Sequence, residues 1–99
     1  MYVVALMTDK PGVGDVRRQT RPSYRAYLRD HPAHPNVTVH HAGPTIADDG
    51  ETLAGVMLVL EAPSLDAARA FIADSPFAKA DVFADGDIRQ FDWITGNPS

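Results

Sequence analysis

The chain has 99 residues, a formal net charge of -4 at pH 7 and no cysteine. A chain of this length fits one domain, which we expect to span residues 1–99, and the missing thiols exclude a disulfide framework and a thiolate zinc site. The absence of cysteine fits a reducing cytoplasm, where we expect the protein. Because it has no basic stripe and no apolar run as long as a membrane span, we expect it to bind neither nucleic acid nor a membrane.

The first part of the chain predicts a strand and a helix. Residues 2–8 form a continuous apolar run, and residues 9–12 close it with a Pro-Gly turn. Helical spacing of apolar and aromatic side chains follows over residues 13–30. Pro22 either kinks this helix or lies in its first turn, so we expect regular helix over residues 22–30.

The middle of the chain predicts two strands. Two prolines make residues 31–36 a loop, and alternation over residues 37–42 predicts a second strand that Gly43-Pro44 ends. Residues 47–50 form an acidic turn. Residues 52–61 then predict the third and most apolar strand.

The last third predicts a second helix and a closing strand. Ser64 is a good N-cap for a helix that Ser75-Pro76 ends. Residues 77–85 are expected to form an irregular or short helical connection. Alternation over residues 87–94 predicts the last strand, and the end of the chain, residues 94–99, is expected to be a frayed tail.

The order β-α-β-β-α-β predicts an α+β protein of the ferredoxin-like type, with one sheet and two helices on one of its faces. A sheet with one face in water shows alternating apolar and polar residues. Residues 2–7 and 56–60 show no such alternation, so both faces of these strands are expected to be covered. A second copy of the chain covers the second face most simply, and we therefore expect a homodimer formed through the sheet.

Several short motifs, in order and at matching spacing, carry a resemblance to a known family. They are Asp9-Lys10-Pro11-Gly12, Arg17 with Arg21-Pro22-Ser23-Tyr24-Arg25-Ala26-Tyr27-Leu28, Ala42-Gly43-Pro44 with Asp48-Asp49-Gly50, Glu61-Ala62-Pro63-Ser64, Ser75-Pro76-Phe77-Ala78-Lys79-Ala80 and Ile88-Arg89-Gln90-Phe91. Over roughly residues 1–93 the chain resembles the YciI-like (YCII-related) family of dimeric α+β barrel proteins. The resemblance implies a single YciI-like domain with lyase, isomerase or dehydrochlorinase chemistry on a small organic acid, without a cofactor.

The resemblance also implies where the family's His–Asp pair would lie. Its His falls three residues after the Arg of the Arg-Pro pair, which is Tyr24 here. Its Asp directly precedes the Pro-Phe pair, which is Ser75 here, and Asp74 stands one residue earlier. A shift of one residue at a helix end turns a side chain by about 100°, so Asp74 is not expected to replace it. Both members of the pair are therefore changed in this chain.

Tyr24 can still donate a hydrogen bond or act as a general acid, because a phenol has a reference pKa of about 10. Our hypothesis is that it polarises a substrate oxygen in a cleft that Ser75 also lines, while Arg17 and Arg21 bind a carboxylate or enolate. In the alternative interpretation, Tyr24 packs with its hydroxyl at the rim. The arginines are then solvated or pair with acidic residues of the turn, namely Asp48, Asp49 or Glu51.

Two of the four histidines are candidates for an acid–base role. His40 and His41 are adjacent on the predicted strand, so they are expected to face opposite sides of the sheet. We expect His41 to lie near Tyr24 as the second catalytic group; alternatively, each is a hydrogen-bonded histidine of the core or the interface. The histidine spacing does not suit zinc, so no metal site is expected.

Two functions follow from these residues. The first is a homodimeric, cofactor-free enzyme, in which Tyr24 and His41 transfer protons while Arg17, Arg21 and Ser75 bind a small organic acid. The alternative is a non-catalytic dimer that has lost the family's His–Asp pair and binds a metabolite or a partner protein. A cavity in which these side chains converge would favour the enzyme.

Overall fold

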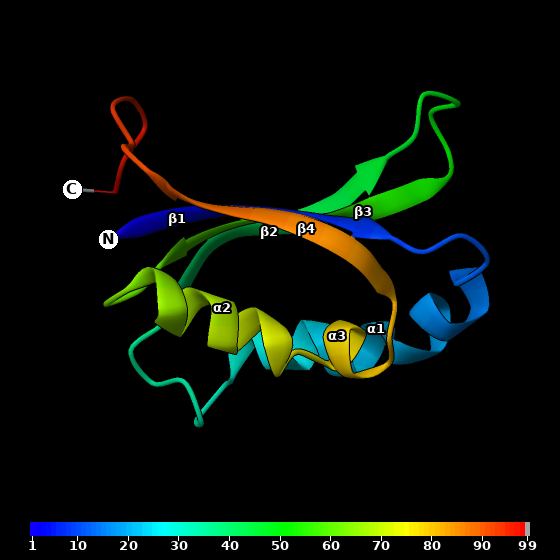
Figure 1. The fold of residues 1–99 in the computed structure, drawn as a ribbon, viewed down its shortest axis with the longest axis horizontal. Coiled ribbons are helices and arrows are strands. Elements are labelled where there is room, and N and C mark those ends of the chain that lie inside the picture. The colour runs from blue at the N-terminus through cyan, green and yellow to red at the C-terminus, as the bar shows by residue number, and fades with distance from the viewer. Residues whose placement is uncertain (99) are drawn as a thin grey trace.

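Four strands form one antiparallel sheet in the order β2-β3-β1-β4 in the computed structural model, which describes residues 1–98. The elements are β1 (Tyr2–Asp9), α1 (Gly14–Arg29), β2 (Thr38–Ile46), β3 (Leu53–Glu61), α2 (Leu65–Ala73), the short α3 (Pro76–Lys79) and β4 (Phe83–Phe91). The helices all lie on one face of the sheet, as Figure 1 shows. This arrangement confirms the predicted ferredoxin-like α+β class.

The two central strands, β1 and β3, are apolar on both faces of the sheet. Val3 and Leu60 pair with each other and are fully buried on the side of the helices. On the other side Leu6 pairs with Met57, and these residues are 50% and 42% exposed. The helices cover one apolar face of these strands and leave the other apolar face without a helix (Figure 1). We call this side the open face; it carries Tyr2, Val4, Leu6, Met57, Val59 and Glu61.

α1 begins earlier than the sequence predicts and continues through Pro22. It is one helix over Gly14–Arg29, whereas the pattern predicts regular helix over residues 22–30. Pro22 cannot donate to the carbonyl of Arg18, but both residues are exposed, so water can satisfy that oxygen.

None of the helices in residues 1–98 has the length and apolar character needed to cross a bilayer.

β2 also differs from the prediction, because it extends to Ile46 instead of ending at Gly43-Pro44. Proline has no backbone N–H to donate, so sheets tolerate it at an edge. β2 is an edge strand, and Pro44 pairs there with Val56 of β3. Gly43-Pro44, which the sequence predicts to end the strand, is therefore part of the sheet.

β4 occupies residues 83–91 instead of the predicted 87–94. It pairs with β1, and Phe91 lies opposite Tyr2, the first residue of that strand. β1 offers no partner beyond this point. The strand therefore ends there, although the alternation in the sequence continues.

The segment after β4 makes local contacts. The indole Nε1 of Trp93 donates to the carbonyl of Thr95 at 2.7 Å, and the side-chain amide of Asn97 donates to the carbonyl of Trp93 at 3.1 Å. A turn thus forms where the sequence predicts a frayed tail over residues 94–99. Of that tail, residue 99 lies outside the described residues.

Gly55 allows a close approach between the two central strands. A Cβ atom at this position would lie 1.8 Å from the carbonyl oxygen of Met7 in β1. The carbonyl of Gly55 also accepts a hydrogen bond from Nη2 of Arg17 at 2.8 Å. Any side chain here would separate β3 from β1 and disturb the Arg17 contact, so the position requires glycine for reasons of space.

Replacing Gly55 with alanine should lower the free energy of unfolding by about 1–3 kcal/mol, because the added carbon overpacks a backbone contact. In a domain of this size each kcal/mol lowers the melting temperature by about 4–8 °C. Calorimetry on Gly55→Ala measures the fall. Gly14→Ala is the matched control, since nothing lies within 4 Å of a Cβ there. Equal melting temperatures for the two variants would contradict this account of Gly55.

Candidate functional site

A cavity of about 370 Å³ lies between α1, α3 and the strands β2 and β3. Cavities of this size hold small-molecule ligands. Arg17, Arg21 and Tyr24 line it from α1, and Phe77 lines it from α3. Three of the predicted site residues therefore meet in one cavity, which we call the Tyr24 cavity. Its other walls are Arg25, Leu28, Ala42, Gly43, Pro44, Leu53 and Val56.

Tyr24 combines a stacked ring with a free hydroxyl. Its ring lies on that of Phe77, with centroids 4.0 Å apart and planes 15° from parallel. Its hydroxyl has no hydrogen-bond partner within residues 1–98 and is not sealed from solvent, so it can bind a ligand. Burial raises the pKa of this hydroxyl, while the nearby charge of Arg17 lowers that pKa to a smaller extent. Tyr24 is therefore a neutral hydrogen-bond donor at neutral pH and not a base.

Arg17 is buried and is held by three contacts. Its Nε donates to Oδ2 of Asp9, and its Nη2 donates to the carbonyl of Gly55, both at 2.8 Å. Its guanidinium carbon lies 4.8 Å from the centroid of the Phe77 ring. Arg17 thus pairs with Asp9 and not with the acidic turn considered above, and the protein itself balances its charge.

Arg21 supplies a positive charge to the Tyr24 cavity. It lies one helical turn after Arg17 and is half-buried, and no carboxylate of residues 1–98 lies within ion-pair distance of it. A guanidinium in a partly dry site binds a carboxylate or a phenolate through charge-assisted hydrogen bonds. The exposed Arg25 adds a second charge at the edge of the same cavity.

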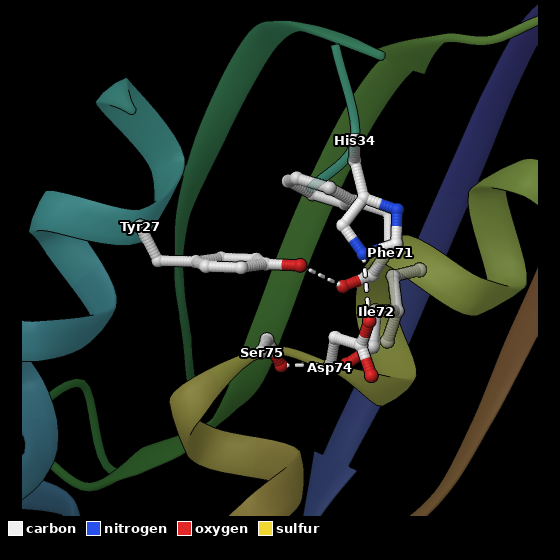
Figure 2. Close-up of polar contacts among 6 residues, drawn as sticks. All are labelled: Tyr27, His34, Phe71, Ile72, Asp74 and Ser75. Atoms are coloured by element: carbon white, nitrogen blue, oxygen red, sulfur yellow. Dashed lines mark hydrogen bonds and ion pairs between the residues drawn. The ribbon is translucent and has the colours of Figure 1, made fainter. Parts of the chain in front are cut away.

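Ser75 does not line the Tyr24 cavity, contrary to the prediction. Its buried hydroxyl donates to the carbonyl of Ile72 at 2.6 Å (Figure 2) and accepts from the amide of Ala78 at 3.4 Å. These bonds cap α3. The only proton of the hydroxyl is used inside the protein, so Ser75 has a structural role and no donor left for a substrate.

Asp74 does not line the Tyr24 cavity either. Its Oδ2 lies 2.7 Å from Nε2 of His34, in the loop that follows α1 (Figure 2). Beside this pair, the hydroxyl of Tyr27 donates to the carbonyl of Phe71 at 2.6 Å. These contacts tie the end of α1 and its loop to the end of α2. Asp74 therefore contacts His34 and none of the side chains that line the Tyr24 cavity.

The two adjacent histidines of β2 lie on the same face, and the expectation that His41 approaches Tyr24 is wrong. Val39 pairs with Leu60 and His41 with Val59, so a β-bulge leaves His40 as an extra residue. Both imidazole rings approach the ring of Trp93, with centroid distances of 5.5 Å for His40 and 5.7 Å for His41. The bulge cancels the strand alternation and places both histidines on the open face, across the sheet from Tyr24.

His40 is further held by Glu61, which lies on the open face. Its Nε2 is 2.9 Å from Oε1 of that carboxylate. This contact agrees with the alternative interpretation, in which the histidines are hydrogen-bonded structural residues. His41 is exposed on the same face.

A second cavity, of about 610 Å³, adjoins the first, and Arg17, Arg21 and Leu53 line both. Asp9 also lines it, so we call it the Asp9 cavity. The side chain of Asp9 is 6% exposed, and its Oδ1 is buried without a hydrogen-bond partner in residues 1–98. The sequence indicates only that Asp9 follows the first strand. The sequence pattern does not identify Asp9 as a site residue, because its ion-pair partner Arg17 lies in a different element.

High pH should destabilise the folded protein through Tyr24 and Tyr27. Burial, with a smaller contribution from the Asp74 charge, raises the pKa of Tyr27 to about 12, and burial also raises the pKa of Tyr24. Unfolded tyrosines lose their protons at about pH 10. The stabilisation is therefore complete below about pH 10 and is lost as the pH rises towards 12.

Tyr24→Phe should weaken this pH dependence. Between about pH 8 and pH 11 the free energy of unfolding of the wild type should fall by about 1 kcal/mol more than that of the variant, since one pKa unit corresponds to about 1.4 kcal/mol. Urea unfolding at the two pH values measures both falls. An equal fall in the two proteins would show that Tyr24 ionises as readily in the folded state as in the unfolded state.

Comparison with known proteins supports the fold. The model of the YCII-related domain matches residues 1–92. That range includes β1 to β4 and every side chain of the Tyr24 cavity. Among curated proteins, none matches this chain.

One similar solved structure is 5-chloro-2-hydroxyhydroquinone dehydrochlorinase (TftG) from Burkholderia phenoliruptrix AC1100, in complex with 2,5-dihydroxybenzoquinone. It is 28% identical to this chain with a TM-score of 0.80, and the match covers 93% of this chain and 94% of that one. The protein At3g17210 from Arabidopsis thaliana shares 12% identity at a TM-score of 0.43, over 92% of each chain.

Proposed function

We propose that this chain, which belongs to the YCII-related domain family, is a cofactor-free enzyme of the lyase, isomerase or dehydrochlorinase kind that acts on a small organic acid. The observation that carries the proposal is the Tyr24 cavity, where a free phenol and the unpaired charge of Arg21 face the same space. The likeness to a dehydrochlorinase over nearly the whole chain supports it further.

The cavity suits reactions that build up negative charge on an oxygen. Loss of HCl, or a proton shift next to a carbonyl, passes through an enolate-like state, and a fixed donor and a cation stabilise such a state when water is excluded. Tyr24 supplies the neutral donor and Arg21 supplies the cation. The stacked rings of Tyr24 and Phe77 give the cavity an aromatic wall, which favours a flat ring as the body of the substrate.

Chloride release from 5-chloro-2-hydroxyhydroquinone tests this proposal. Tyr24→Phe should lower kcat/KM by about 10²-fold or more, as loss of a donor to a developing oxyanion does. Arg21→Gln should mainly raise KM. Arg69→Gln is the matched control, since Arg69 is a surface arginine of α2 that pairs with Asp66 and lines neither cavity. An active wild type whose turnover is unchanged in Tyr24→Phe would contradict the role of the phenol.

The alternative function, a dimer that binds a metabolite without converting it, is favoured by one observation. The residues that line the Tyr24 cavity include no carboxylate, histidine or cysteine, so the cavity has no obvious proton acceptor. In that case 2,5-dihydroxybenzoquinone should bind without any turnover of the chlorinated compound. Tyr24→Phe should then leave its affinity within a few-fold of the wild type.

A second copy of the chain is the proposed partner of the open face. Leu6 and Met57 lie side by side there and are half exposed, and Phe91 is 37% exposed at the adjoining edge. Apolar side chains gathered on one uncovered sheet face favour sheet-against-sheet association over a free surface. The same face carries His40 and His41, so in this arrangement they are interface residues.

Leu6→Glu should convert the dimer into a monomer, because the substitution puts a charge in the middle of the apolar contact. Sedimentation velocity measures the mass of the species in solution. Val16→Glu, on an exposed position of α1, is the matched control and should leave the dimer intact. A monomeric wild type would remove this part of the proposal.

A further inference from the structure

One carboxylate oxygen of Asp9 is buried and has no partner. Asp9 Oδ2 accepts from Nε of Arg17, but Oδ1 has no donor within hydrogen-bond distance in residues 1–98. An acceptor that is removed from water and left unbonded is costly, and more so when it is charged. A group outside the described chain is therefore expected to donate to Oδ1.

Oδ1 itself has almost no accessible surface, so a donor reaches it only if the carboxylate turns towards the cavity that Asp9 lines. Asp9 lines the second cavity, and this cavity shares Arg17, Arg21 and Leu53 with the Tyr24 cavity. Arg17 stands between the two, since it contacts Phe77 of the first and Asp9 of the second. A molecule seated in the Tyr24 cavity therefore needs to extend only past Arg17 to approach Asp9.

The charges around the Asp9 cavity indicate what kind of donor fits. Lys10, Arg18 and Arg21 line it together with Arg17, and its two carboxylates are those of Asp9 and Glu51. Four cationic side chains against two carboxylates disfavour a metal ion or an ammonium group. Lys10 pairs with Asp81 and Arg18 pairs with Asp15, which leaves Arg21 as the uncompensated cation. A carboxylate would instead be repelled by Oδ1. A neutral donor on a molecule whose other group is anionic satisfies both Asp9 and Arg21.

We propose that the two cavities form one bipartite site for a hydroxylated aromatic acid, with the ring in the Tyr24 cavity, the anionic group on Arg21 and a ring hydroxyl donating to Oδ1 of Asp9. This inference rests on the proposed function and adds the substrate class to it. Asp9 is the specificity-determining residue of the site, because it distinguishes acids that carry a hydroxyl from those that do not. Rejection of a ligand that leaves a buried polar group unpaired is the usual physical basis of such selectivity.

Binding of 3-hydroxybenzoate, 4-hydroxybenzoate and benzoate, measured by NMR titration, tests the proposal. At least one hydroxybenzoate should bind the wild type about tenfold or more tightly than benzoate, the ratio that a hydrogen bond to a charged acceptor supports. In Asp9→Asn the amide oxygen can still accept from Arg17, which turns its NH₂ group towards the ligand. The ligand hydroxyl then meets a neutral NH₂ group in place of a charged acceptor, so the preference for the hydroxybenzoate over benzoate should fall to within about twofold.

Asp66→Asn is the matched control, since it removes the carboxylate of another Asp–Arg pair, at the surface of α2. It should retain the preference for the hydroxybenzoate. If Asp9→Asn does not fold, the carboxyl ¹³C resonance of Asp9 in the wild type gives the answer without a variant. It should shift on addition of the preferred hydroxybenzoate and stay in place on addition of benzoate.

Three results would overturn the proposal, and they separate it from the proposed function. Equal binding of all three acids at Tyr24 and Arg21 would leave the enzyme proposal standing and remove the role of Asp9. A hydroxyl preference that persists in Asp9→Asn would mean that the hydroxyl is recognised by a group other than Asp9. Failure of all three acids to bind would remove this proposal, while chloride release from 5-chloro-2-hydroxyhydroquinone decides the proposed function separately.

Discussion

The Arg17 side chain is the contact on which the rest of the site depends. It joins three elements at once, because Nε binds Asp9 at the end of β1, Nη2 binds the carbonyl of Gly55 in β3, and the guanidinium lies against Phe77 of α3. A buried guanidinium is stable only when its charge is balanced and its donors are used, and these contacts meet both needs. They also fix α1 over the sheet, which sets the width of the cavity beneath Tyr24 and separates it from the cavity beside Asp9.

In this arrangement the two neighbouring arginines have different roles. Arg17 is committed to structure, whereas Arg21, one turn later, has no carboxylate partner among residues 1–98 and remains available to an anion. Tyr24 stays neutral because burial raises its pKa, so the cavity offers a donor and a cation and no base of its own. The chemistry open to the site is therefore stabilisation of an oxyanion. Asp9 lies on the other side of Arg17, in the adjoining cavity.

The fold could be predicted from the sequence because it follows from apolar periodicity and turn residues, and these are local. The continuous apolar strands also indicated correctly that the sheet is apolar on the face that the helices do not cover. The predictions failed where the extent of a strand or the direction of a side chain depends on a neighbouring strand from elsewhere in the chain. Pro44 stays in a strand because β2 is at the edge, β4 ends where β1 ends, and a bulge after Val39 turns both histidines to one face. Arg17, Arg21 and Tyr24 could be found from helical spacing, whereas Ser75 and Asp9 take their roles from contacts that only the folded chain reveals.

The central claim is that the Tyr24 cavity, and not the open face, is the binding site for a small aromatic acid. Backbone ¹⁵N shift mapping with 2,5-dihydroxybenzoquinone tests it most directly, because different backbone amides report on the Tyr24 cavity and on the open face. The account predicts saturable shifts at Tyr24, Gly43 and Phe77, with little change at His41 and Trp93. Shifts confined to His41 and Trp93, or no saturable shift at any residue, would contradict it.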